Sequence, residues 1–309
     1  MKFFIILLVC FALLACGLGH EPTASNSAAA PQKDERVRRL AKSKDSLVQF
    51  FQPMRVRDGD WLGSHPENGE TFEEYVESGP TLPTAERNKI YVQPLGEFTG
   101  EQMKVVRLTA DYLHAFYNLP VVVREADVLN DVPSDMQRIR YPNNLQIRTS
   151  YFFNRLPSML PNDAAALICF TNYDLYPEDT WNYVFGQASL EDRVGVWSLW
   201  RLERDGAKKT NADKFLDRTL KIATHETGHM FSMRHCKKYE CLMSGSNSLD
   251  ETDRRPLDTC PECTMKIAWA LQYQPAERYK NLAEFWRKQK RTSEEKLMLD
   301  KMRSVGDVR

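Results

Sequence analysis

Residues 225–235 read HETGHMFSMRH and contain the residue types of a catalytic zinc site. If this segment is helical, His225 and His229 lie one turn apart on one face and can bind the same Zn²⁺ ion. Glu226 lies beside them, where it can accept a proton from a zinc-bound water. His235 supplies a third imidazole once the chain has turned back. Three protein ligands leave one tetrahedral position open, which is typical of catalytic rather than structural zinc.

Four cysteines follow this segment and predict either a second metal site or two disulfides. One pair is spaced C-x4-C and the other C-x-x-C, and the residues are Cys236, Cys241, Cys260 and Cys263. Such a set matches a closed four-thiolate zinc site, which has no open position and serves structure. Disulfides are the alternative, because an export signal would place the chain in an oxidising compartment. Cys169 lies in the apolar run AAALICF and is interpreted as a buried core thiol.

The first residues predict export and a lipid anchor. Lys2 precedes the apolar run FFIILLVCFALLA, which fits an export signal and is short for a membrane span. Residues 13–16 read LLAC and resemble the lipobox of bacterial lipoproteins, so Cys16 is the expected lipid-attachment site. An ordinary cleaved signal peptide is the alternative. A lipid on Cys16 would hold the protein at a membrane surface, in the bacterial periplasm or on the cell surface.

The composition indicates a folded, soluble body. The 309 residues include 42 basic and 42 acidic side chains, so no net field attracts the chain to nucleic acid. Hydrophobic residues make up 42% of the chain, which is ample for a core. We therefore expect no nucleic-acid partner; the oligomeric state is open, with a monomer favoured. Changes in composition predict a signal peptide, a flexible tether after the anchor, a folded domain and a charged C-terminal tail or exposed helix, at 1–15, 16–45, 46–289 and 290–309.

Hydrophobic periodicity predicts strands that alternate with helices. Strands are expected at 88–93, 119–123, 165–170, 184–189 and 194–200, and helices at 99–117 and 144–156. This alternation favours a mixed α/β sheet over a helical bundle. Residues 210–213 offer capping side chains for the helix that carries the two motif histidines, and that helix is expected to end near Ser232.

The combined pattern HExxHxxSxxHC-x4-C-x-M-x16-C-x-x-C resembles the archaemetzincin family of metalloproteases. The similarity extends to GDWLGSHPENGETFEEY at 59–75, IYVQPLGEF at 90–98 and GSNSLDETDRRPLDTCPEC at 245–263, and so covers roughly residues 50–275. The resemblance implies a compact α/β (α+β) domain of the metzincin type. Such a domain has a twisted mixed sheet, a central active-site helix and a small C-terminal part that four cysteines bind to zinc.

The resemblance also implies roles for individual residues. His225, His229 and His235 would hold the catalytic zinc, and Glu226 would act as general base in peptide-bond hydrolysis. The four cysteines would bind a second, structural zinc, and Met243 would form the methionine turn beneath the catalytic metal. An extended peptide substrate would pair with an edge strand, for which residues 184–189 are the candidate.

A surface binding protein with zinc sites but negligible turnover is the alternative function, although the intact Glu226 argues against it. The chain also departs from the family pattern. Ser232 replaces the usual glycine at the bend before the third histidine, and the spacing from Met243 to Cys260 is slightly shorter. If the bend requires a positive φ, the serine costs roughly 1–2 kcal/mol. The export signal is unusual, since the family is otherwise associated with soluble cytoplasmic proteins.

Overall fold

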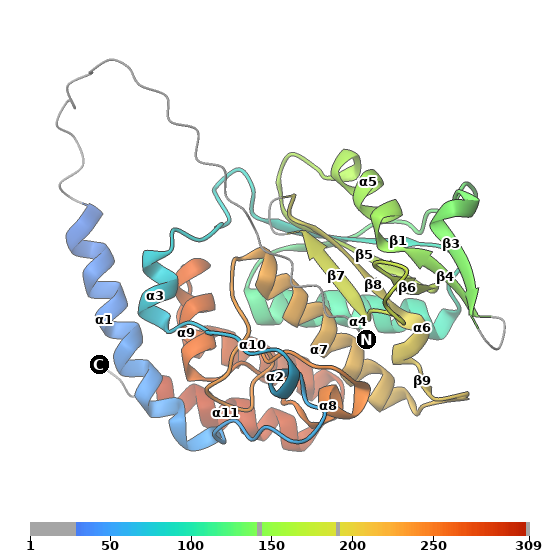
Figure 1. Ribbon diagram of the computed structural model, residues 1–309. Coiled ribbons are helices and arrows are strands. Elements are labelled where there is room, and N and C mark those ends of the chain that lie inside the picture. The colour runs from blue at the N-terminus through green and yellow to red at the C-terminus, as the bar shows by residue number, and fades with distance from the viewer. Residues whose placement is uncertain (1–28, 141–143, 190–191, 307–309) are drawn as a thin grey trace, which may run out of the picture.

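The computed structural model describes residues 29–140, 144–189 and 192–306 (Figure 1). The predicted signal peptide and the lipid-attachment site at Cys16 lie outside these residues. Among the described helices, none is both long enough and apolar enough to span a lipid bilayer.

A five-stranded mixed sheet lies at the centre of the fold, in the order β2-β1-β5-β8-β7. Its strands are β1 (Lys89–Leu95), β2 (Val121–Val123), β5 (Ala164–Thr171), β7 (Gly186–Ser189) and β8 (Val194–Ser198). Strand β5 is buried over its whole length, as expected for a central strand of a sheet covered on both faces. Strands β1, β2, β5 and β8 are parallel, whereas β7 runs antiparallel to β8 at one edge. The predicted α/β class is confirmed.

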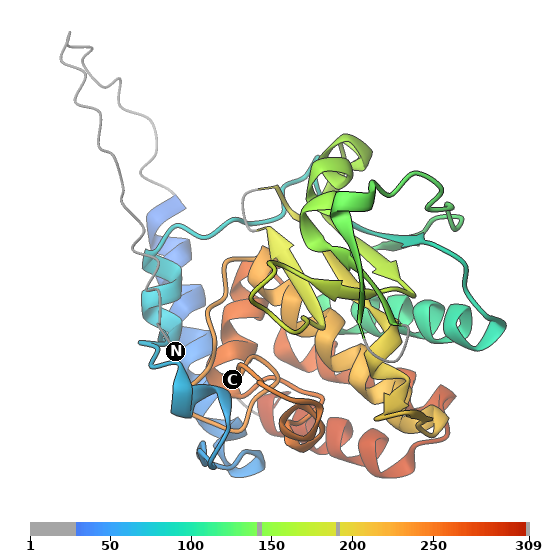
Figure 2. The same ribbon diagram turned by 45° about the vertical axis from the view of Figure 1, so that its right-hand side comes forward.

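Helices cover both faces of this sheet (Figures 1 and 2). Helices α4 (Gly100–Tyr117) and α7 (Ala212–Met230) share one hydrophobic core with Ile168 and Phe170 of β5. Helix α5 (Thr149–Met159) shares a second core with Leu167 and Cys169, which alternate with the first pair along the same strand. The sheet therefore forms the middle layer, and Cys169 is the buried thiol that the sequence predicted.

Residues 144–156 differ from their prediction as a single helix. Residues 144–148 form strand β4 (Asn144–Arg148), which pairs with β3 (Gln137–Arg140) and β6 (Asp174–Tyr176) in a separate three-stranded sheet. The reason is a contact distant in sequence: the amide nitrogens of Asn144 and Gln146 donate to Asp174 at 2.6 and 2.7 Å. Helix α5 begins only after this strand.

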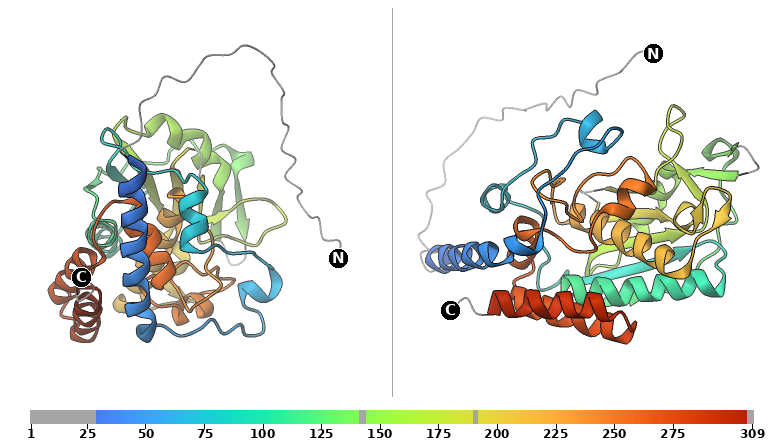
Figure 3. Two further views of the ribbon diagram at one scale, coloured as in Figure 1. Left: turned by 90° about the vertical axis from the view of Figure 1, so that its left-hand side faces the viewer. Right: turned by 90° about the horizontal axis from the view of Figure 1, so that it is seen from below.

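The C-terminal half is mostly helical. Its helices are α8 (Leu249–Arg254), α9 (Pro261–Ala270), α10 (Pro275–Lys288) and α11 (Thr292–Gly306). The N-terminal part adds α1 (Ala29–Leu47), α2 (Trp61–Ser64) and α3 (Phe72–Glu77). Short elements complete the description: η1 (Val48–Phe50), η2 (Ser134–Met136), α6 (Leu199–Leu202), β9 (Arg204–Asp205) and β10 (Lys208–Lys209). Figure 3 shows α1 lying beside α9 and α10 running along α4, and α11 packs on α10.

The described part of both terminal segments differs from what we predicted, a flexible tether at 16–45 and a charged tail or exposed helix at 290–309: residues 29–45 are helical, and the C-terminal helix is partly buried. Helix α1 begins at Ala29, and its Leu40 and Leu47 are buried in the main core. Helix α11 packs on α10 and buries Met298 and Val305. These segments look hydrophilic overall because their few apolar residues are spaced at helical intervals, which is sufficient to form a packed stripe.

A buried ion cluster fixes α11 to the rest of the domain. Asp258 accepts hydrogen bonds from Lys301 on α11 at 2.7 Å and from Arg278 on α10 at 2.5 Å. All three side chains are almost fully buried. Burial alone would raise the pKa of Asp258, but the two cations together hold it below its usual value. Removal of one cation therefore leaves a buried carboxylate incompletely compensated.

We expect Lys301→Met to lower the free energy of unfolding by about 2 kcal/mol or more, because it removes a charged hydrogen bond from the buried Asp258. Lys296→Met on the same helix is the matched control. Its ion pair with Asp300 involves a lysine whose side chain is 77% exposed, so its loss should cost about 0.5 kcal/mol or less. Urea denaturation of both variants measures the difference; equal losses would contradict the structural role of Lys301.

Candidate metal centre

Helix α7 and the bend after it bring three histidines together. Asn211 caps the start of α7 by accepting a hydrogen bond from the Lys214 amide, and the helix ends at Met230. His225 and His229 lie on its last two turns, with ring centroids 4.7 Å apart. The ring of His235 lies 5.2 Å from that of His225 and 4.9 Å from that of His229. Each histidine presents a ring nitrogen within 4.8 Å of the other two, so the group could hold one metal ion.

Hydrogen bonds fix which ring nitrogen of each histidine faces the centre. The Nδ1 atom of His225 donates to the Leu242 carbonyl at 2.8 Å, and that of His229 to the Met233 carbonyl at 2.6 Å. A carbonyl oxygen only accepts, so Nδ1 carries the proton and Nε2 has the free lone pair. These two Nε2 atoms lie 3.0 Å apart. Burial lowers the pKa of all three imidazoles, and the neutral form is the one that binds metals.

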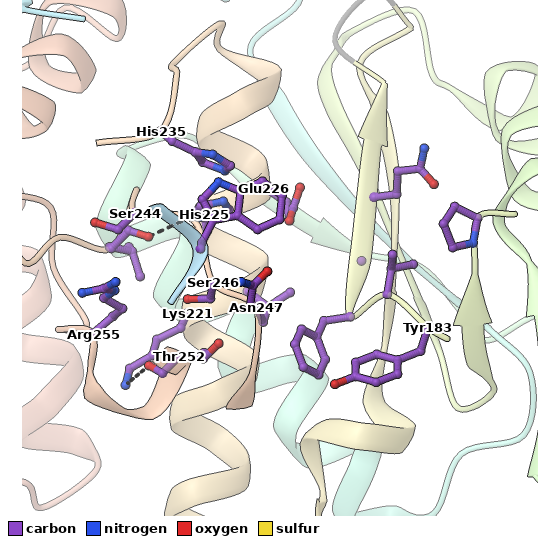
Figure 4. Close-up of a pocket in the computed structure, with 18 of the residues that line it drawn as sticks. Tyr183, Lys221, His225, Glu226, His235, Ser244, Ser246, Asn247, Thr252 and Arg255 are labelled. Atoms are coloured by element: carbon purple, nitrogen blue, oxygen red, sulfur yellow. Dashed lines mark hydrogen bonds between the residues drawn. The ribbon is translucent and has the colours of Figure 1, made fainter. Parts of the chain in front are cut away.

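Glu226 follows His225 in the sequence, but its side chain is directed away from the three histidines. Figure 4 shows its carboxylate directed into the neighbouring pocket, toward the side of β7. Burial raises the pKa of this carboxyl group to about 7. A buried carboxyl group beside a set of metal-ligating nitrogens has the position required of a proton acceptor.

The pocket beside Glu226 has a volume of about 430 Å³ and is walled by segments from both halves of the chain. One wall is α7, and the opposite wall comes from β7 and the preceding loop, which includes Tyr183 (Figure 4). The third wall is formed by residues of the segment 242–255, which begins directly after Cys241. Lys221 closes the floor: its ammonium donates to the carbonyls of Thr252 and Asp253 at 3.0 and 2.9 Å. A pocket open along an edge strand can accept an extended chain.

Met243 lies directly beneath the histidine-bearing part of α7. It is fully buried, and a Cβ atom added to Gly228 would lie only 2.6 Å from its sulfur. The glycine inside the HETGH motif therefore allows the methionine to approach the helix backbone. The amide of Cys236 donates to the Met243 carbonyl at 2.7 Å, which ties the bend to the cysteine loop. The role of Met243 in a methionine turn beneath a catalytic metal stays a prediction from the resemblance.

The four clustered cysteines form a second potential metal site. All four are buried and free, and their sulfurs lie within 4.8 Å of one another. The sulfurs of Cys236 and Cys260 are 3.6 Å apart. A tetrahedral zinc with Zn–S bonds of about 2.3 Å separates its sulfurs by roughly 3.8 Å, whereas a disulfide bond measures about 2.05 Å. The amides of Met243 and Cys260 donate to the Cys241 sulfur, which fits a thiolate ligand. The arrangement therefore fits a metal better than it fits disulfides.

Sequence reasoning missed two residues at the histidine cluster. Glu67 accepts a hydrogen bond from His235 Nδ1, and Trp61 packs edge-on against the same imidazole with ring centroids 5.5 Å apart. Both belong to the segment 59–75, which carries part of the family resemblance. Nothing in its local pattern indicates the contact, because more than 160 residues separate Glu67 from His235. Only the tertiary structure brings them together.

The bend at Ser232 has the backbone conformation that favours glycine, with φ of +63°. The serine hydroxyl nevertheless has a function there, because it accepts a hydrogen bond from the Thr81 amide at 3.0 Å. The strain of a non-glycine residue is thus offset by a link to the N-terminal segment. This explains how the chain tolerates its departure from the family pattern.

We expect Ser232→Gly to leave the free energy of unfolding nearly unchanged, because roughly 1 kcal/mol of relieved strain offsets the lost hydrogen bond. Ser232→Ala keeps the strain and loses the bond, so it should destabilise the protein by about 1 kcal/mol. Thermal or urea unfolding of the pair distinguishes these two contributions. If the alanine variant were as stable as the wild type, the hydrogen bond to Thr81 would contribute nothing; if it were as stable as the glycine variant, the strain at this bend would contribute nothing.

Comparisons with known proteins agree with this geometry. The model of Peptidase family M54 matches residues 147–269. Archaemetzincin-2 of Pongo abelii is 35% identical over 266 residues, which cover 75% of this chain and 74% of the relative. Archaemetzincin-2 of Homo sapiens is 36% identical over 271 residues, with coverage of 75% and 74%.

Two solved archaemetzincins are also similar to this chain. The archaemetzincin of Methanopyrus kandleri superposes with a TM-score of 0.50 at 25% identity, over 62% of this chain and 98% of that one. The archaemetzincin of Archaeoglobus fulgidus, solved in complex with malonate, gives a TM-score of 0.46 at 29% identity, over 58% and 99%. Given the extent of its similarity to the curated archaemetzincins, this chain belongs to the archaemetzincin family of zinc metallopeptidases.

Proposed function

We propose that this peptidase binds its catalytic zinc through His225, His229 and His235 and uses Glu226 as general base. The observation that supports this most strongly is the convergence of three imidazoles whose Nδ1 atoms are each occupied by another hydrogen bond. Bound zinc would polarise the scissile carbonyl and lower the pKa of a water molecule. The set leaves a fourth tetrahedral position for that purpose.

Glu226 performs the proton transfers in this proposal. Its carboxylate reaches into the pocket where the substrate carbonyl would lie (Figure 4). It accepts a proton from the attacking water and then donates it to the amine of the leaving peptide. Among the described residues that line the pocket, Glu178 is the one other carboxylate, and it is exposed to solvent, so Glu226 is the group assigned to both steps.

The peptide substrate is proposed to bind along β7. This strand pairs with β8 on one side only, so its other edge is available for backbone hydrogen bonds. Gly186 and Gln187 of β7 line the pocket together with Phe185. An extended peptide that pairs there would cross the pocket within reach of Glu226. The predicted candidate strand, 184–189, thus contains the observed edge strand, whereas the pairing with substrate is a proposal.

The four cysteines are proposed to hold a second, structural zinc. Their site has four protein ligands and no open position. Cys236 directly follows His235, and Leu242, whose carbonyl orients His225, directly follows Cys241. A metal at the cysteines would therefore stabilise the loop that positions part of the catalytic centre.

Export and anchoring are also proposed, on the sequence pattern alone. The LLAC run at residues 13–16 supports cleavage before Cys16 and its acylation, with a surface or periplasmic location for the peptidase domain. Mass spectrometry of the mature N-terminus separates a lipidated Cys16 from an ordinary cleaved signal peptide.

We expect Glu226→Gln to abolish peptide cleavage while zinc content stays at two ions per chain, because the amide cannot accept the proton and the ligands are unchanged. His225→Ala should lower the content to one ion, by removing one of three ligands from a single site. The measurements are elemental analysis of the purified chains and cleavage of a mixed peptide library.

Two results would contradict the proposal. Undiminished cleavage by Glu226→Gln would exclude this residue as the base. One zinc per wild-type chain that survives His225→Ala would place the metal at the cysteines alone and favour a binding protein without turnover.

A further inference from the structure

The N-terminal segment crosses the histidine cluster and is fixed there by several contacts. Figure 1 shows α2 beside α8, on the opposite side of the molecule from α5. The Trp61 amide donates to Glu251 at 3.0 Å, and the Asn247 side chain donates to the Gly59 carbonyl at 3.1 Å. Asp60 forms an ion pair with Arg254. These contacts connect the segment to the loop and helix that wall the pocket.

Within this segment, Glu67 has two well-defined donors. His235 Nδ1 lies 2.9 and 3.0 Å from its two carboxylate oxygens, and Trp61 Nε1 donates to one of them at 2.9 Å. The indole packs so closely on Gly245 that an added Cβ there would lie 2.4 Å from the ring. The close contact with Gly245 fixes the position of the Trp61 ring, and its Nε1 in turn fixes the Glu67 carboxylate.

Among the three histidines, His235 has the least support from its own backbone. His225 and His229 project from a regular helix and donate to carbonyl oxygens. His235 lies beyond the left-handed Ser232, outside any helix, and its Nδ1 partner is an anion. A carboxylate accepts only, so the proton resides on Nδ1 and the Nε2 lone pair faces the other two imidazoles. Such a carboxylate partner also increases the basicity of the ring nitrogen that binds a metal.

We propose that Glu67 is a positioning residue for the third zinc ligand, and that the segment holding Trp61 and Glu67 completes the metal centre from outside the region that the family model matches, residues 147–269. Glu67 itself does not bind the metal. It fixes the tautomer and the orientation of His235. This inference rests on the proposed binding of zinc by the three histidines.

The test measures zinc affinity in the full-length protein by competition with a chromogenic chelator. Glu67→Ala should weaken one of the two zinc sites by about 10–100-fold, the range found when such outer partners are removed. Glu67→Gln should restore part of this loss, because its amide oxygen still accepts the His235 proton but carries no charge. Glu73→Ala on α3 is the matched control: its side chain is 49% exposed and, within the described part of the chain, its ion pair is with Lys44, so both affinities should stay at the wild-type values.

Partial rescue by glutamine separates positioning from general structural damage, because a misfolded segment would not recover with the conservative variant. Trp61→Phe provides an independent variant if Glu67→Ala does not fold. It keeps the ring and removes the indole donor to Glu67, so we expect a smaller loss of affinity at the same site.

The outcomes also separate this inference from the proposed function. If His225→Ala removes one zinc whereas Glu67→Ala and Trp61→Phe, both folded by circular dichroism, bind zinc as the wild type does, the positioning role is overturned and the histidine site stands. If His225→Ala removes no zinc, the proposed function fails first, and the role of Glu67 fails with it.

Discussion

At Ser232 the chain leaves α7 in a left-handed conformation and turns back on itself. Both potential metal-binding clusters depend on this reversal. It brings His235 over the last turn of the helix, and it directs Cys236 toward the other cysteines. The same loop then returns beneath α7, where the Leu242 carbonyl orients His225 and Met243 fills the space left by Gly228. A single short connection therefore determines the geometry of two sites.

The polar groups of this region are satisfied in a consistent way. The outer nitrogen of each imidazole has one acceptor, which leaves the three inner nitrogens as lone pairs that face one another. Three neutral, partly buried acceptors within 4.8 Å of one another are unfavourable without a cation between them, because none of them can donate to another. The neighbouring Glu226 is turned away from this cluster and into the pocket (Figure 4). The arrangement separates the groups suited to holding a cation from the group suited to moving a proton.

The local parts of this site could be predicted from the sequence, because their determinants are spacings. His225 and His229 share a helix face at positions i and i+4. The C-x-x-C pair also has a local determinant, because Cys260 caps the start of α9 and Cys263 lies in its first turn. The contribution of Glu67 could not be predicted, since its only link to His235 is through folding. The strand conformation of β4 could not be predicted either, because it depends on Asp174. Nor could the packing of α11, because nothing in its charged sequence indicates that Lys301 is buried against Asp258. Long-range partners, not local propensity, decided each of these.

The peptidase centre lies where the two halves of the molecule meet. Helix α7 and β7 belong to the half built on the sheet, whereas the loop through Met243 and the α8 wall belong to the helical half. Residues 231–248 contain no regular helix or strand. Few of their backbone groups are therefore paired in the repeating hydrogen bonds of a helix or sheet. A metal held by the four cysteines would supply the missing constraint, because its binding free energy becomes folding free energy for this loop. Such a metal would also stabilise the proposed peptidase centre, because the Leu242 carbonyl that orients His225 belongs to the same loop.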